Sequence, residues 1–278
     1  MPNVDLHCHS SASDGSLSPH ELLDHAREQG VDILALTDHD TTLGLASAAR
    51  AAARVGVRLV PGIEISVSWG GRTIHILGLN IDPDNAALNQ GLARLREFRH
   101  WRAGEIARKL DKAGIPGSYD AVCGMAAEQI ISRTHFARFL LENGHARDIK
   151  QVFKRYLVSG KPGHVAGKWA SLAEAIGWIH AAGGRAVIAH PARYRLSATR
   201  LRSLFNEFKE LGGEGLEVIS GSQNRRECAS MAQYARQFDL LASCGSDYHG
   251  PQHGWLALGR VAPLPVGCTP VWHDWDVM

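Results

Sequence analysis

The chain has 278 residues, a length at which single α/β barrels are common. Hydrophobic residues make up 45% of it and charged residues 21%, which leaves enough apolar material for a sizeable core. The formal net charge is only +2, which argues against binding a polyanion over the whole surface but leaves room for a local basic pocket. Histidine is abundant, with 15 copies against 7 phenylalanines and 5 tyrosines, and this excess requires an explanation.

The cysteines and the N-terminal residues bear on the cellular compartment. Five scattered cysteines without a C-x-x-C pair suggest no disulfide framework, so a reducing compartment is the simplest interpretation. The first residues carry no basic stretch followed by an apolar run, and no window approaches the roughly 18 apolar residues of a membrane span. We therefore expect a soluble cytoplasmic protein, with no membrane partner and no protein partner indicated.

The first part of the chain alternates between predicted strands and predicted helices. A helix start is well marked at Ser18, a candidate N-cap, with Pro19 at the first helical position and Glu21 completing a capping box. Short apolar runs such as DILALT are typical of strands covered on both faces. The expected strands are 3–7, 32–37, 58–64 and 72–81, and the expected helices are 18–30 and 43–55.

The rhythm changes in the middle of the chain. Residues 85–114 predict one long helix, and 115–167 are irregular and mostly helical, without a convincing strand. Alternation then returns, beginning with a capping box at Ser171 and Glu174. We predict an α/β fold with a parallel sheet closed into a distorted barrel. Its expected parts are a first barrel segment (1–98), an inserted helical substrate-capping domain (99–167) and a second barrel segment (168–278).

Polar residues gather where the predicted strands end. In a parallel barrel these ends meet on one face, where active sites are built. Imidazole and carboxylate ligands together suit Zn, Mn or Fe, and the candidates are too many for a single ion. The pattern therefore predicts two or three divalent ions, with Glu64 bridging two of them. The residues at or near strand ends are His7, His9, Asp38, His39, Asp40, Glu64, His75, His190, Asp247 and His249.

Each of these features has an ordinary explanation when it is taken alone. An H-x-H pair such as His7 and His9 is a weak signal, and a single histidine such as His75 on a strand is more often not a ligand. Asp38 or Asp40 could cap the following helix, and Asp14 before a glycine is a common turn residue. Chance alone is a poor explanation for a histidine or an acidic residue at almost every predicted strand end. The whole set therefore favours the metal hypothesis.

The set DLHCHSSASDG, LTDHD, PGIEIS, IAHP and GSDYH resembles the PHP (polymerase and histidinol phosphatase) domain family over about residues 1–80 and 170–260. The resemblance implies a distorted seven-stranded (β/α) barrel with a trinuclear metal centre. It implies His7, His9, Glu64 and Asp247 on the first ion. It implies Asp14, His39, His190 and His249 on the second, and Glu64, His75 and His135 on the third.

The long predicted helix carries two arginines in an apolar stripe of spacing four and three. Arg99 and Arg102 continue the face of Leu92, Leu95 and Ile106, so they are candidates for an inward pair that grips a phosphate. The alternative is that Phe98 and Trp101 define the buried face and leave both arginines in solvent. Arg133 and Thr134, beside His135, are further phosphate-contact candidates, whose alternatives are a surface charge and a helix cap.

The barrel with its insertion is similar to a PHP subgroup of nucleoside 3′,5′-bisphosphate phosphatases and 5′–3′ exoribonucleases. We expect a phosphoric monoester hydrolase that removes the 3′-phosphate of a bisphosphate such as pAp through attack by a metal-bound hydroxide. The arginines would hold the 5′-phosphate. Manganese is the preferred metal, with zinc or iron as alternatives. The candidates for catalysis are Asp247, His249 and His190.

Three other functions remain open. The same site could remove nucleotides stepwise from short 5′-phosphorylated oligonucleotides, or it could act as a histidinol-phosphatase-like enzyme on another small molecule. A third possibility is a metal-binding regulatory module without catalysis. The sequence assigns neither a base preference nor an oligomeric state.

Overall fold

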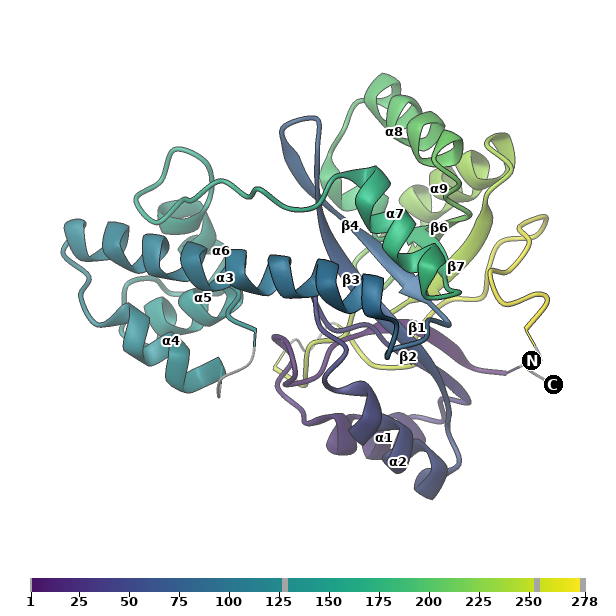
Figure 1. Ribbon diagram of the computed structural model, residues 1–278, viewed down its shortest axis with the longest axis horizontal. Helices are drawn as coiled ribbons and strands as arrows, with labels where there is room; N and C mark the ends of the chain where they lie inside the picture. Colours follow the sequence, from purple (N-terminus) through teal and green to yellow (C-terminus); the bar gives the residue numbers. More distant parts are fainter. Residues whose placement is uncertain (1, 127–129, 253–255, 276–278) are drawn as a thin grey trace.

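The computed structural model describes residues 2–126, 130–252 and 256–275 (Figure 1). Within them, seven strands form one sheet in sequence order, from β1 to β7. The strands are β1 (Val4–Cys8), β2 (Ile33–Leu36), β3 (Arg58–Trp69), β4 (Arg72–Leu79), β5 (Arg185–Ile188), β6 (Gly215–Ser220) and β7 (Leu241–Gly245).

The sheet curls until its two edges meet. The His9 amide donates to the Tyr248 carbonyl over 2.9 Å, and the Asp247 amide donates to the His7 carbonyl over 2.7 Å. Both hydrogen bonds join residues at or just beyond the carboxyl ends of β1 and β7. The fold is therefore the expected α/β barrel, nearly closed, and the two edge strands bring their polar ends together.

The prediction of a wholly parallel sheet is wrong at one strand. β4 runs antiparallel to both β3 and β5. The cause is a tight hairpin at Gly70 and Gly71, both with positive φ, which lets β3 continue to Trp69 before the chain turns back. Glu64 consequently lies inside a long strand, and the earlier placement of this residue at a strand end is also wrong.

The helices begin where their caps predict. Ser18 with Glu21, and Ser171 with Glu174, form complete capping boxes at the starts of α1 and α7. Helix α2 instead begins at Gly44 without a side-chain cap, so neither Asp38 nor Asp40 caps it. The helices are α1 (Pro19–Glu28), α2 (Leu45–Val55), α3 (Ala86–Lys112), α4 (Ser118–Ala126), α5 (Arg133–Glu142), α6 (Ile149–Val152), α7 (Leu172–Ala181), α8 (Ala198–Glu210) and α9 (Arg225–Gln237), with a π-helix η1 (Phe153–Leu157) and a 3₁₀-helix η2 (Pro191–Tyr194).

The described residues form two separate hydrophobic clusters that share helix α3. Leu88, Leu92 and Leu95 in its first half pack into the barrel core. Ala103 and Ile106, farther along, belong to a second cluster formed with α4, α5 and α6. Figure 1 shows α3 leaving the barrel, with these helices gathered around its far half. No helix in the described part of the chain is long and apolar enough to cross a membrane.

Candidate metal centre

Histidines and carboxylates from several strands converge in four overlapping groups, in each of which the potential ligand atoms lie within 4.8 Å of one another. His7 belongs to β1, Glu64 to β3 and His75 to β4. The others follow β1, β2, β5 or β7 in the chain. The groups are His9, Asp14, His39 and His249; His7, Glu64 and His190; His7, His9 and Asp247; and His39, Glu64 and His75.

Glu64 is the hub of this arrangement. Its Oε1 lies 2.9 Å from His75 Nδ1 and 3.0 Å from His190 Nε2, while its Oε2 lies 2.9 Å from His39 Nδ1 and 3.3 Å from His9 Nε2. One carboxylate therefore faces imidazoles on both of its oxygens. Such an arrangement suits a group that bridges two ions.

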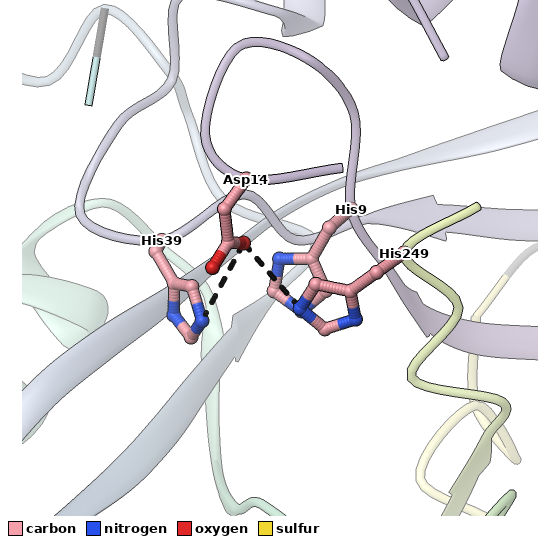
Figure 2. Close-up of side chains that lie close together, drawn as sticks. All are labelled: His9, Asp14, His39 and His249. Atoms are coloured by element: carbon pink, nitrogen blue, oxygen red, sulfur yellow. Dashed lines mark ion pairs between the residues drawn. The ribbon is translucent and has the colours of Figure 1, made fainter. Parts of the chain in front are cut away.

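Asp14 and Asp247 occupy the two flanks of Glu64. Figure 2 shows Asp14 among His9, His39 and His249, and its Oδ1 lies 3.4 Å from His249 Nε2. Asp247 Oδ1 lies 3.2 Å from His9 Nε2 and 3.3 Å from His7 Nε2. The three carboxylates thus divide the histidines into adjacent, overlapping sets.

Protonation in the metal-free chain follows from these contacts. Burial alone would raise the pKa of Glu64, but the histidines around it hold that pKa well below its usual value. Burial alone would lower the pKa of His9, yet Asp247 and Glu64 raise it to about 10. Burial lowers the pKa of His39 to about 4 against the opposing effect of Glu64 and Asp14. Glu64 is therefore ionised, and His9 carries a proton beside it that a bound metal ion could replace.

The buried atoms fit divalent cations. Several ligand atoms have no hydrogen-bond partner although they lie about 3–4 Å from an atom of opposite character. Two ligands bound tetrahedrally to one ion at about 2.1 Å would be about 3.4 Å apart, which is the spacing seen here. Buried polar atoms without partners are costly, and a cation would satisfy them. The atoms with such a neighbour are His7 Nε2, His9 Nε2, Asp14 Oδ1, His39 Nδ1 and Glu64 Oε2, and His9 Nδ1 and His190 Nδ1 also have no hydrogen-bond partner.

The grouping differs from the ligand sets that the family resemblance implies: His9 also joins Asp14, His39 and His249, His39 also joins Glu64 and His75, and His190 and His135 are placed differently. His190 lies with His7 and Glu64, and not with Asp14, because its loop turns sharply after β5 at a positive φ of 29°. His135 is in none of the four groups. Its Nδ1 accepts a hydrogen bond from the Ser132 amide at the start of α5. Burial lowers the pKa of His135 and the Asp14 carboxylate opposes this shift, so the ring lies near the ligand groups.

The predicted phosphate contacts come together beside this centre. Arg99 and Arg102 are 6% and 8% exposed, so the inward orientation is correct, and Trp101, 58% exposed, does not define a buried face. Arg99 pairs with Asp40 and Ser66, whereas the hydrogen bonds of Arg102 within the described residues go to the Val165 carbonyl. Both guanidinium groups lie over the Trp169 ring, at 5.0 and 5.3 Å from its centroid.

The second pair of predicted contacts lies on α5. Arg133 is half-buried, with its guanidinium 5.7 Å from the Phe153 ring centroid. Burial together with Arg99 lowers the pKa of Arg133, and burial together with Arg133 and Arg99 lowers the pKa of Arg102. Arg102 and Arg133 therefore lie in a cluster with Arg99 in which the charges of Arg102 and Arg133 are disfavoured in the absence of an anion. Thr134 Oγ1 donates to Asp14 Oδ2 over 3.1 Å and links α5 to the metal ligands.

Comparison with known proteins decides the family. A model of the PHP domain matches residues 5–185, which is more than half of the chain. The chain belongs to the PHP family. A 3′,5′-nucleoside bisphosphate phosphatase from Chromobacterium violaceum is 47% identical over 99% of this chain and 96% of its own, and a 5′–3′ exoribonuclease from Haemophilus influenzae is 46% identical over 97% of each.

Solved structures agree with this PHP assignment. An amidohydrolase from Chromobacterium violaceum has a TM-score of 0.94 at 47% identity, and the match covers 98% of this chain and 95% of that one. A chain from Bifidobacterium adolescentis, assigned as a metal-dependent phosphoesterase, has a TM-score of 0.81 at 28% identity over 96% and 92%. The metal-dependent character of such neighbours agrees with the four ligand groups of this PHP chain.

Sequence reasoning missed several residues that orient the PHP ligands. Glu217, fully buried in β6, lies 3.0 Å from His7 Nδ1 and accepts from the His190 amide. Arg193 pairs with Asp247 and donates to Ser222. Glu217 is the central acid of the strand GLEVIS, and a charged residue in an otherwise apolar buried strand is the signal that could have identified it.

Proposed function

We propose that this PHP protein is a metal-dependent phosphoric monoester hydrolase that converts nucleoside 3′,5′-bisphosphates such as pAp to 5′-monophosphates. The observation that carries the proposal is the pairing of two opposite sites: a carboxylate–histidine centre suited to cations and a buried arginine cluster suited to an anion. Thr134 links the two directly through Asp14. A bisphosphate has one phosphate for each. The similarity to a bisphosphate phosphatase over nearly the whole chain supports this choice.

The two sites divide the work. We propose His7, His9, Asp14, His39, Glu64, His75, His135, His190, Asp247 and His249 as ligands of two or three divalent ions, with Mn²⁺ as the expected metal. When bound, such ions stabilise charge on a phosphate and lower the pKa of water to about 7. Arg102 and Arg133 bind the 5′-phosphate, because Arg99 is already paired with Asp40. This orients the sugar with its 3′-phosphate over the ions.

Asp247, His249 and His190 are the proposed proton-transfer groups. Burial alone would raise the pKa of Asp247, but His7 and Arg193 keep it well below its usual value, so Asp247 is an ionised carboxylate that positions the histidines beside it for proton transfer. Burial lowers the pKa of His190, which is then neutral near pH 7. We also propose a division of the chain at residues 98/99 and 167/168, supported by the two hydrophobic clusters that meet within α3.

A 5′–3′ exoribonuclease is the second candidate, because relatives so named are 45–46% identical over nearly the full chain. Product analysis on pAp, 5′-AMP and a 5′-phosphorylated oligonucleotide, side by side with added Mn²⁺, tests the proposal. We expect pAp to give 5′-AMP and phosphate, and 5′-AMP to be left intact. Turnover of the oligonucleotide without turnover of pAp would reject the phosphatase function.

A further inference from the structure

The positive charge of the protein is concentrated in the helical segment 99–167. This segment contains twelve lysines and arginines against six aspartates and glutamates, a formal net charge of +6. Since the whole chain carries +2, the remaining residues carry −4. Such an asymmetry between two parts of a chain is typical of proteins that bind a polyanion with one part.

Part of this charge surrounds a hollow on the outer surface of the segment. The hollow has a volume of about 440 Å³ and is lined by Gln151, Lys154, Arg155, Tyr156 and Lys161. Its three cations are exposed, and across residues 2–126, 130–252 and 256–275 no carboxylate pairs with any of them. We call these five residues the basic hollow. Arg155 Nη1 and the Tyr156 hydroxyl both donate to the His145 carbonyl over 3.3 Å, which holds a guanidinium beside an aromatic residue. Cations beside a tyrosine and an amide match the two parts of a nucleotide, the phosphate and the base.

The basic hollow is connected to the arginine cluster by a short stretch of chain. Lys161 is four residues from Val165, whose carbonyl accepts both hydrogen bonds of Arg102. Between them, the Lys109 ammonium donates to the His164 carbonyl over 2.7 Å. The four residues from Lys161 to Val165 span at most about 14 Å. Arg102, Lys109 and Lys161 therefore all lie on or beside this short stretch, which leads from the proposed phosphate pocket to the surface.

A second connection runs through η1. Arg133 of the arginine cluster lies over the ring of Phe153, and the next residue, Lys154, lines the basic hollow. A small bisphosphate would use only the buried end of this path. A longer strand anchored by its 5′-phosphate would have further phosphates to place on the exposed end.

We propose that the basic hollow is an exosite that binds the downstream phosphates of a single-stranded oligonucleotide whose 5′ end lies in the arginine cluster. This inference rests on the proposed function, because it takes the arginine cluster as the 5′-phosphate pocket. It assigns an oligonucleotide, in addition to a mononucleotide bisphosphate, to the same catalytic centre. The hollow acts on binding and leaves the chemical step unchanged.

The test is a triple variant that removes the three positive charges of the basic hollow, Lys154→Gln, Arg155→Gln and Lys161→Gln, in the full chain with Mn²⁺. The matched control removes three exposed cations from barrel helices through Arg27→Gln, Arg50→Gln and Arg202→Gln. Two readouts are needed: hydrolysis of pAp, and anisotropy binding of a fluorescent 5′-phosphorylated octamer with slowly cleaved phosphorothioate linkages. Binding is measured over a series of salt concentrations.

We expect the triple variant to bind the octamer about tenfold more weakly or worse, and the slope of log affinity against log salt to fall by about 2. Its kcat/KM for pAp and the binding of the control variant stay within twofold of the unchanged protein. Octamer affinity equal to that of the unchanged protein overturns the exosite. So does an equal loss of octamer binding in the control variant. If the unchanged protein fails to hydrolyse pAp, the proposed function fails while octamer binding still tests the hollow.

Discussion

The barrel and the helical segment 99–167 solve opposite electrostatic problems. In the barrel, three buried carboxylates are surrounded by histidines that keep them ionised. In the helical segment, buried arginines lie close to one another, and their charges are disfavoured. The first arrangement attracts cations and the second attracts anions. A substrate with two phosphates can bind both parts of the protein at once, provided that the barrel and the helical segment keep a fixed relative position.

The two parts also differ in how their residues are held. Barrel ligands lie on strands or in the loops that follow them. Buried Glu217 contacts the ring of His7, and buried Asp38 accepts hydrogen bonds from Ser10 and Ser13 in the loop that carries Asp14. In the helical segment, Arg99 pairs with Asp40 and Ser66, whereas Arg102 is held by one backbone carbonyl, and Arg102 and Arg133 lie over aromatic rings. Ligand geometry in the barrel is therefore shared among many residues, whereas Arg102 and Arg133 each have few contacts among the described residues. Losses in the barrel should affect metal content, and losses in the helical segment should affect substrate affinity.

Glu64→Gln should have the largest effect. The substitution keeps the shape of the side chain but removes the charge that faces His75, His190, His39 and His9. We expect the metal content after Mn²⁺ reconstitution to fall below two ions per chain. The kcat/KM for pAp should fall by at least about 1,000-fold, beyond the 10–100-fold typical of residues that only orient ligands.

Elemental analysis and steady-state kinetics measure both effects. Glu214→Gln is the matched control, because Glu214 is a half-buried carboxylate that contacts His180 and Arg185 away from the centre. Retention of full metal content together with activity would contradict the hub role of Glu64.

Arg102→Met tests the other side of the comparison. The arginine contributes a charge-assisted contact of about 1.5–3 kcal/mol, so the KM for pAp should rise about 10- to 150-fold with a smaller change in kcat. 3′-AMP, which lacks the 5′-phosphate, should be hydrolysed by the variant and the unchanged protein with similar kcat/KM. Metal content should not change.

Arg108→Met is the control on the same helix, because Arg108 is exposed and its ion pair within the described part of the chain is with Glu105, one turn away. Equal losses for pAp and 3′-AMP in Arg102→Met would mean that the arginine supports the fold and does not hold the 5′-phosphate. The comparison between the two substrates is therefore decisive.

Glu217→Gln should have an intermediate effect that appears in metal affinity. Glu217 holds the ring of His7 and the amide of His190, so its loss leaves the ligands present but less well oriented. We expect Mn²⁺ to bind about 10- to 100-fold more weakly. Activity should return at high Mn²⁺ concentration. Failure of excess metal to restore activity would show that Glu217 does more than orient ligands.

The sequence predicted most of the barrel because its signals are local. Capping boxes such as Ser18 with Glu21 mark helix starts, and short apolar runs mark buried strands. The direction of β4 was not predicted, because its apolar pattern is the same whether it runs parallel or antiparallel. The signal that decides it is the Gly70–Gly71 pair, whose positive φ values form the hairpin.

The candidate site was predicted as a set of residues but not as a geometry. Strand ends indicated which side chains would converge, and the four-three spacing of α3 correctly predicted that Arg99 and Arg102 are buried. The place of His190 depends on a backbone turn after β5, and that of Glu217 depends on which face of β6 meets the barrel interior. Both are set by tertiary packing, which no short sequence pattern contains.

The smallest expected effect is the release of protons on metal binding, which should occur in the barrel and not in the helical segment. His9 has a pKa of about 10 in the metal-free chain and is protonated at pH 8, whereas His39, with a pKa of about 4, is already neutral. A divalent ion requires neutral imidazoles, so its binding must displace the proton of His9. Between pH 7 and 9 we expect metal binding to release at least one proton per chain. For each proton released, metal affinity should rise about tenfold per pH unit.

Calorimetric titration of Mn²⁺ in two buffers of different ionisation enthalpy measures this release. Arg102→Met should release the same number of protons, because the arginine cluster takes no part in binding cations. Metal binding without proton release would mean that the histidines around Glu64 and Asp247 are neutral before the ion arrives. In that case the barrel would hold its carboxylates ionised without the help of imidazolium, and the electrostatic contrast with the helical segment would be greater than described above.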